Sequence, residues 1–227
     1  MLPNDAILLA MTPSAWHELV DAALVACRDA PLTLGESPLA QSSLLLDGLL
    51  ADEDLNWDLQ RLGMRALFRW AVDKLRPDGE PDWLDETWRP YLCLYHNYFA
   101  RLKFPAIARK MALSEKSIFN WRDKASERLT QIIRQELQMK VDRLLRKTYW
   151  LVERYRAHAA HEQALLGLLA LLRQPVPQPD VELLATQAHL AYQPVNLDNL
   201  LLGGLLVKHS PQGVQVHAEV RPLLITG

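Results

Sequence analysis

A long stretch without glycine or proline constrains the fold of this 227-residue chain more than any other feature of its sequence. Neither residue type occurs between residues 106 and 166. Within this stretch the apolar residues recur at intervals of three and four, which is the spacing of one helix face. The recurring positions are Leu129, Ile133, Leu137, Val141, Leu144, Leu151 and Tyr155. The pattern predicts a very long helix whose apolar seam forms an internal spine or a contact between two copies of the chain.

The beginning of this stretch has the pattern of two helices joined by a short turn. A first helix is expected over residues 105–112, because Pro105 is tolerated in a first helical turn. Leu113 would form the turn, and the hydroxyl of Ser114 could cap the second helix by accepting from a free backbone N–H. The apolar positions that would pack the two helices together are Ile107, Ala108, Met111, Leu113, Ile118, Trp121, Ala125 and Leu129. Residues 104–129 are therefore predicted to form a helix-turn-helix, with a plain helical hairpin in a bundle as the alternative.

The polar face of the second helix carries side chains that suit contact with DNA. Lysine, asparagine and serine can hydrogen-bond to base edges in the major groove, and an aromatic ring such as Phe119 can contact a thymine methyl group. Asp123 falls on the same face. The residues expected to approach bases are Lys116, Ser117, Asn120 and Lys124. Those expected to contact phosphate or support the helix are Lys103, Arg109, Lys110 and Arg122.

Residues 104–129 resemble the helix-turn-helix of sigma-factor region 4 and of LuxR-type regulators. The matching residues are Ile107-Ala108, Leu113-Ser114, Ser117-Ile118, Ala125 and Arg128-Leu129. Trp121 departs from these families, because it follows Ile118 by three residues where they more often place an apolar residue four after. That variant is more similar to transposase or terminase-type helix-turn-helices. The resemblance implies a protein that binds double-stranded DNA, and a single helix-turn-helix usually works as a dimer.

Charge is distributed unevenly along the chain, although the net charge is only −2. Residues 101–150 contain 13 Lys/Arg and 5 Asp/Glu, so they carry +8. Residues 1–100 contain 7 and 16, which gives −9, and residues 151–227 contain 5 and 6, which gives −1. The concentration of positive charge on the predicted helix-turn-helix is the pattern expected of a nucleic-acid-binding element. Alternatively, the acidic first part of the chain docks on this basic segment.

The first 100 residues are expected to form an acidic helical domain. Thr12-Pro13 and Ser37-Pro38 have the pattern of helix starts. Helices are expected over residues 13–28, from 38 through 50, from 52 or 54 to 75, and over 87–102. The last carries aromatic residues that would form core and support the helix-turn-helix: Trp88, Tyr91, Tyr95, Tyr98 and Phe99. The acidity of this part disfavours the alternative, a stacking platform for single-stranded nucleic acid.

The end of the chain has the element order of a winged helix. Residues 174–179, QPVPQP, are predicted to be a linker. Helices are expected over 165–172, 180–189 and 195–202, followed by strands over 205–207 and 214–217 with a turn at 210–213. The segment 200–224 resembles the winged helix that follows the nucleotide-binding domain of STAND-type signalling ATPases.

The third of these helices is the DNA-reading helix in winged-helix proteins that bind DNA. Here it carries Asn196, Asp198 and Asn199 but no lysine or arginine, and the wing offers only Lys208 and His209. Because charge neutralisation of phosphates dominates DNA affinity, we expect this module to contact protein or to mediate dimerisation.

The sequence gives no pattern of a catalytic, metal or cofactor site. His158 and His161 could share one helix face, but no HExxH order and no nearby cysteine accompany them, so they are expected to be surface histidines. No Gly-rich phosphate loop and no nucleophile elbow occur. Cys27 and Cys93 are expected to be reduced core thiols, and no apolar run reaches the roughly 18 residues of a membrane span. With no secretory signal at the start, a cytoplasmic protein without membrane contact is expected.

These patterns together predict a mostly α fold with three parts. Residues 1–100 would be the acidic helical domain, 101–160 the helix-turn-helix with a long connecting helix, and 161–227 a winged-helix-like domain with a small β-hairpin. The predicted function is that of a non-enzymatic transcriptional regulator that reads duplex DNA. A homodimer through the long helix or the C-terminal module, and a larger protein complex, are further expected partners. The alternative is a non-catalytic adaptor for protein–protein contacts in a signalling or transposition/defence complex.

Overall fold

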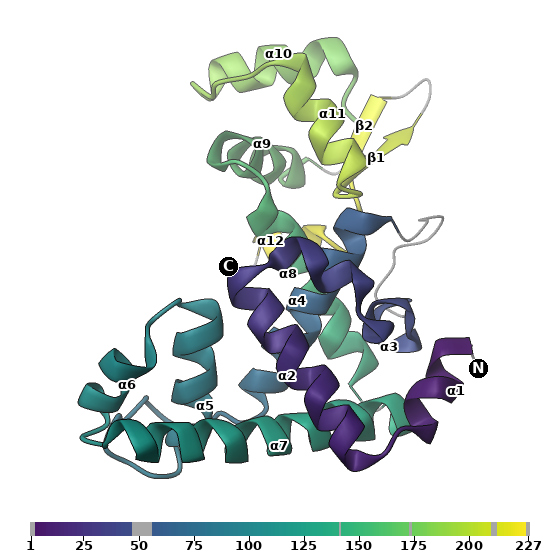
Figure 1. Ribbon diagram of the computed structural model, residues 1–227. Coiled ribbons are helices and arrows are strands. Elements are labelled where there is room, and N and C mark those ends of the chain that lie inside the picture. Colours follow the sequence, from purple (N-terminus) through teal and green to yellow (C-terminus); the bar gives the residue numbers. More distant parts are fainter. Residues whose placement is uncertain (1–2, 47–55, 141, 173, 210–212, 226–227) are drawn as a thin grey trace. The chain divides into compact units, whose positions relative to one another are not determined.

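A computed structural model describes residues 3–46, 56–140, 142–172, 174–209 and 213–225. The chain is mostly helical, with a small antiparallel two-stranded sheet near the C-terminus, so the predicted fold class is confirmed (Figure 1). Its described residues form two compact units, one within residues 3–150 and the other within residues 151–225. The boundary between the two units falls after residue 150, whereas the sequence predicted divisions after residues 100 and 160. Residues 101–150 belong to the first unit because they share one hydrophobic core with the first hundred residues.

Two helix starts at the beginning of the first unit form as predicted. After α1 (Pro3–Ala10), α2 (Pro13–Asp29) is capped by Thr12, whose hydroxyl accepts from the backbone N–H of Ala15. The 3₁₀ turns η1 (Pro31–Glu36) and η2 (Pro38–Gln41) follow, and Ser37 caps the second of them.

The helix expected from residue 38 through 50 is broken instead. The turn η2 ends at Gln41, and the short α3 (Ser43–Leu46) begins afresh. The hydroxyl of Ser42 donates to the Leu39 carbonyl at 2.7 Å, and the carboxylate of Asp5 accepts from Ser43 N at 2.9 Å. Asp5, which is 38 residues away in the sequence, thus starts the new helix. Residues 47–50 of the helix expected over 38–50 lie outside the described residues.

The next helices lead to the helix-turn-helix. α4 (Trp57–Asp73) is capped by Asn56, while the start expected at Asp52 or Asp54 lies outside the described residues. α5 (Arg89–Leu94) continues into one π-helical turn, η3 (Tyr95–Phe99). The helix expected to reach residue 102 ends at this turn, because Arg101 takes a left-handed backbone with φ 57°. Most of the aromatic set is buried, as expected: Trp88, Tyr91 and Tyr98.

The helix-turn-helix consists of α6 (Phe104–Lys110) and α7 (Glu115–Met139). α7 packs against α2, α4, α5 and α6, which lie along it in Figure 1. The apolar residues Ile107, Ile118 and Leu129 are fully buried in the core of the first unit, as their spacing predicts. α7 is therefore held by several neighbouring helices over much of its length.

The prediction of one very long helix is wrong, because α7 ends at Met139 and α8 (Arg143–Ala157) begins separately. Lys140 between them has φ 51°, and its N–H donates to the Glu136 carbonyl at 2.8 Å. The Glu136 carboxylate accepts from Asp142 N at 3.1 Å and from Arg146 Nε at 2.9 Å. A buried carboxylate on α7 thus holds the first residues of α8 in place.

The apolar seam is consequently divided between two cores. Leu129, Ile133 and Leu137 lie in the first, and Leu151 lies in the second with Tyr155 packed against it. Val141 and the side chain of Leu144 lie outside the described part of the chain.

The second unit has the predicted order of helices and strands. α9 (Ala160–Ala170), α10 (Gln178–Gln187) and α11 (Pro194–Leu202) are followed by β1 (Leu206–His209), β2 (Gly213–Val216) and α12 (Arg221–Ile225). The strands pair in antiparallel register, with Leu206 opposite Val216. The turn predicted at 210–213 lies outside the described residues except for Gly213, which begins β2.

The expected linker at 174–179 is instead part of the second unit's core. Val176 is buried and forms an isolated antiparallel bridge with Val214, with backbone N···O distances of 2.7 and 2.8 Å. The proline-rich composition suggested a linker because prolines lack backbone donors, but Val176 between two of them keeps its own N–H.

Gly213 is required where this bridge meets the hairpin. Its φ is +106°, and a Cβ built there would collide with the carbonyl of Val176. Gly213→Ala is therefore expected to destabilise the second unit by about 2–3 kcal/mol. Hydrogen–deuterium exchange of α9 to α11 measures this loss.

The matched control for this substitution is Gly167→Ala. Gly167 lies within α9 and has open space at its Cβ position, so alanine there is expected to stabilise the helix slightly, by up to about 1 kcal/mol. Equal exchange in the two variants would show that Gly213 has no special role.

Two further features concern apolar segments and the two cysteines. Across the described ranges, none of the helices has the length and apolar character needed to cross a membrane. Cys27 and Cys93 are buried thiols that are not joined in a disulfide, and burial raises the pKa of the Cys93 thiol to about 12.

Candidate nucleic-acid interface

The turn between α6 and α7 is fixed by backbone hydrogen bonds and by one side-chain cap. Leu113 N donates to the Ala108 carbonyl at 2.9 Å, while Ala112 adopts a left-handed backbone with φ 51°. The Ser114 hydroxyl accepts from Ser117 N at 3.1 Å, so the predicted N-cap of α7 is present. A fixed turn sets the direction in which α7 presents its polar face.

Three of the four residues expected to approach bases form one exposed row on α7. Lys116, Asn120 and Lys124 are all exposed and are spaced by four residues, so they lie next to one another along one side of the helix. Arg128 is also exposed and continues the row with the same spacing. It was missing from the predicted set, although the four-residue spacing could have revealed it. The row lies away from the buried side chains of Ile118 and Ala125.

Ser117, the fourth of these residues, is placed differently. It is half-buried, and its hydroxyl lies 2.8 Å from the hydroxyl of Ser114. Its backbone N–H also donates to Ser114. The structure therefore places Ser117 in the helix cap, beside the exposed row and not within it.

Arg122 is half-buried and supports α7. Its Nη2 lies 2.5 Å from the Asp123 carboxylate, and its guanidinium lies 5.9 Å from the ring centroid of Phe119. Burial alone would lower the pKa of Arg122, but Asp123 and Tyr98 outweigh it and raise that pKa above its ordinary value. A charged Arg122 bound to its neighbours fits the supporting role expected for it.

The three cations of the α6 segment are all exposed. Lys103 lies at the N-cap of α6 and Arg109 in its last turn. Lys110 lies with its Nζ 4.7 Å from the ring centroid of Trp83, which in turn stacks on His96 at 4.5 Å. Burial, followed by the charge of Lys110, lowers the pKa of His96, so this imidazole is neutral at pH 7. Lys103 and Arg109 are thus the more available cations of this segment.

Trp121 was expected in the core, but it is only half-buried. Arg89 and Lys124 lie over its ring, at 5.4 and 5.5 Å from the centroid. Its position three residues after Ile118 turns it toward the edge of the helix face, where cations can cover the ring.

In the second unit, both asparagines of α11, the helix that corresponds to a reading helix, hydrogen-bond to α9, although only Asn196 is buried and Asn199 is exposed. Asn199 Nδ2 donates to Glu162 at 2.6 Å, and Asn196 pairs with His161 at 2.9 Å. Asn196 also accepts from Gln193 N at 2.7 Å, which caps α11. These hydrogen bonds hold α11 against α9, and burial of Asn196 keeps its amide from reading base edges.

The side chains of His158 and His161 do not face a shared metal site. His158 is half-buried and lies 3.0 Å from the Glu162 carboxylate, whereas His161 faces Asn196. Burial alone would raise the pKa of Glu162, but hydrogen bonds from Asn199, His158 and the Ala159 N–H lower it below its ordinary value. Among the described residues, no group of three or more His, Cys, Asp or Glu side chains could hold a metal ion.

Comparison with protein-family models, with curated proteins and with solved structures found no match to this chain. The resemblance of residues 104–129 to sigma-factor region 4 and LuxR-type regulators remains a prediction, as does that of the C-terminal segment to STAND-type ATPases. The geometry itself provides a helix-turn-helix with an exposed row of three cations and one asparagine.

Proposed function

We propose that this chain binds duplex DNA through α6 and α7 and acts as a transcriptional regulator. The observation that carries the proposal is the exposed row of Lys116, Asn120, Lys124 and Arg128 on a helix whose opposite side is buried. A helix presented in this way can enter the major groove with its N-terminal half leading. The reduced cysteines fit a cytoplasmic location for such a regulator.

Charge supports the same proposal. Residues 101–150 carry +8, and many of these cations are exposed on the surface of the helix-turn-helix. Each phosphate that a cation neutralises releases counterions, which supplies most of the affinity for DNA of any sequence. Lys103 and Arg109 on the α6 segment would contact phosphate, while the row on α7 would face the bases.

This division of labour predicts different outcomes for two substitutions. Asn120→Ala is expected to relax base preference by about 1–3 kcal/mol, because asparagine can bond two atoms of adenine at once. Arg109→Ala is expected to weaken binding to all sequences alike and to reduce the slope of log affinity against log salt by about 1. Fluorescence polarisation on a selected site and on random duplex DNA, across a salt series, measures both quantities.

Lys208→Ala serves as the control, since this exposed lysine lies on β1 in the second unit. It should leave affinity and salt slope unchanged. If Asn120→Ala and Arg109→Ala have the same effect on specific and random DNA, the proposed roles are wrong.

A second candidate function, an adaptor for protein contacts, is favoured by the surface of the second unit. Leu202 is 82% exposed, Leu171 67% and Leu183 57%. Exposed apolar side chains of this size are available to contact another protein. The absence of DNA binding by the whole chain at low salt would favour this function over the first. Dimerisation, which sedimentation would measure, is compatible with both.

A further inference from the structure

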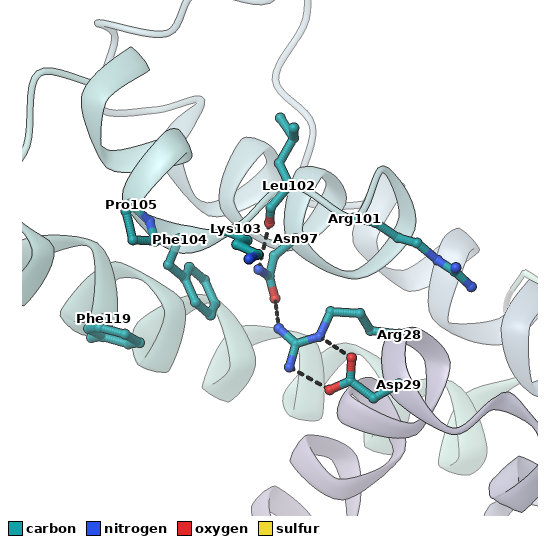
Figure 2. Close-up of a pocket in the computed structure, with 9 residues that line it drawn as sticks. All are labelled: Arg28, Asp29, Asn97, Arg101, Leu102, Lys103, Phe104, Pro105 and Phe119. Carbon is teal, nitrogen blue, oxygen red and sulfur yellow. Dashed lines mark hydrogen bonds and ion pairs between the residues drawn. The ribbon is translucent and has the colours of Figure 1, made fainter.

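A cleft of about 540 Å³ lies at the start of the helix-turn-helix, lined by residues of α2, η3, the segment 101–103, the first turn of α6, and α7 (Figure 2). Arg28 and Asn97 form a hydrogen-bonded wall of this cleft. Arg28 Nη1 donates to Asn97 Oδ1 at 2.7 Å, and Asn97 Nδ2 donates to the Leu102 carbonyl at 2.8 Å. Asn97 is only 1% exposed. This chain of bonds links α2 to the backbone that leads into α6, so the wall has a defined geometry.

The cleft has more positive than negative charge. Among the described residues that line it, Asp29 is the one acidic side chain, and Arg28 binds both carboxylate oxygens of Asp29 at 2.8 and 2.7 Å. Arg101 and Lys103 also line the cleft and are exposed. Within the described ranges, neither of these two side chains has a hydrogen-bond or ion-pair partner. Two positive charges are therefore available to a ligand.

Another part of the lining is apolar. The rings of Phe104 and Phe119 have their centroids 5.1 Å apart and are tilted by 54°, and Pro105 lies beside them. Phe119 is 43% exposed, although it is a large aromatic side chain. In Figure 2 the two rings and Arg101 lie on opposite sides of the Arg28–Asn97 wall. A ligand that spans the cleft would meet aromatic surface at one end and Arg101 at the other, and Figure 2 draws Lys103 between them, beside Phe104.

We propose that this cleft binds a small phosphate monoester with a flat ring, of the mononucleotide or aryl phosphate class. A phosphate monoester carries about −1.5 to −2 charges at pH 7, which matches the two available cations, whereas a carboxylate matches only one. Arginine and lysine are the side chains that proteins use for phosphate. The ring would pack on Phe119, and the cleft has the volume of an ordinary small-molecule site.

Binding of a small phosphate in this cleft is a property separate from the proposed DNA binding, because the ligand can bind when no duplex DNA is present. Phe119 immediately precedes Asn120 of the exposed row, so the ligand would lie beside the reading helix. Binding to the cleft is measured without DNA, so failure of either proposal leaves the other standing.

Isothermal titration calorimetry on the full chain tests the proposal with two probes, adenosine 5′-monophosphate and 1-naphthyl phosphate. Inorganic phosphate and 1-naphthol serve as comparison ligands, because the first has only the phosphate group and the second only the ring. Both ringed phosphates are expected to bind with saturation and about tenfold more tightly than either half, since charge and apolar contact act together. Arg101→Ala with Lys103→Ala, and separately Phe119→Ala, should each weaken binding about tenfold.

The control is Lys116→Ala with Lys124→Ala, which removes two exposed cations of the same helix-turn-helix that do not line the cleft. It should leave the affinity for both probes unchanged. All substituted side chains are exposed, and thermal unfolding verifies that each variant folds. The proposal is overturned if neither ringed phosphate binds with saturation, if the control loses as much affinity as the cleft variants, or if inorganic phosphate binds as tightly as the ringed probes.

Discussion

Replacing Lys116, Asn120 and Lys124 together with alanine is expected to weaken binding to duplex DNA by roughly 100-fold or more near physiological salt. The three side chains are exposed neighbours on one side of α7. Two of them supply positive charge, and the third supplies the paired donor and acceptor that suit adenine. Their loss removes the centre of the proposed interface while leaving the buried face of the helix intact.

Fluorescence polarisation across a salt series measures this effect. Besides the lower affinity, the slope of log affinity against log salt should decrease by up to about 2, since two cations are lost. Arg156→Ala with Lys208→Ala is a control of equal charge, because both side chains are exposed in the second unit. That control should bind DNA as the unmodified chain does.

The possible results distinguish the two candidate functions. Equal losses in the triple variant and in the control would mean that affinity follows total charge and that the row on α7 is not an interface. If the unmodified chain fails to bind DNA at low salt, the adaptor function becomes the better explanation, and the exposed leucines of the second unit become the first residues to test.

Glu136→Ala is expected to lower the free energy of unfolding of the first unit by about 3–5 kcal/mol. Glu136 and Arg146 have side chains that are each only 4% exposed, and they form an ion pair of 2.9 Å. Removing the carboxylate takes this ion pair away from the buried guanidinium of Arg146. The N–H of Asp142 loses its acceptor as well, and with it the contact that holds the start of α8.

Tryptophan fluorescence during urea unfolding measures this loss in the first unit alone, because all seven tryptophans lie between residues 16 and 150. Glu127→Ala is the matched control, since Glu127 is exposed on the same helix and its loss should change stability by no more than about 0.5 kcal/mol. A loss below about 1 kcal/mol for Glu136→Ala would show that the buried pair does not hold the break between α7 and α8.

Much of the candidate interface could be predicted from the sequence, because its elements depend on interactions between near neighbours. The cap of α7 joins Ser114 to Ser117, and the cap of α2 joins Thr12 to Ala15. The apolar spacing of Ile118, Ala125 and Leu129 defines the buried face, which in turn leaves Lys116, Asn120 and Lys124 exposed. Helix periodicity alone was sufficient to assign these faces.

Other parts depended on partners far apart in the chain. Asp5 starts α3 at Ser43, and Val176 pairs with Val214 to become part of the core. In the second unit, α9 bonds both asparagines of α11, and Asn196, which a local pattern would assign to the surface, is buried. The composition of residues 174–179 indicates a linker, and composition carries no information about the pairing that makes Val176 part of the core.

The sequence by itself thus determined the helical class, the helix-turn-helix, the exposed row and the hairpin, since each follows from residues a few positions apart. Only the tertiary structure decided where the long helix breaks and which side chains form the cleft. The break depends on Glu136 meeting Arg146, whose guanidinium also donates to the carbonyl of Leu44. The cleft depends on Arg28 meeting Asn97, 69 residues away. Periodicity describes the faces of one helix, but it does not specify which distant groups will satisfy a buried charge or amide.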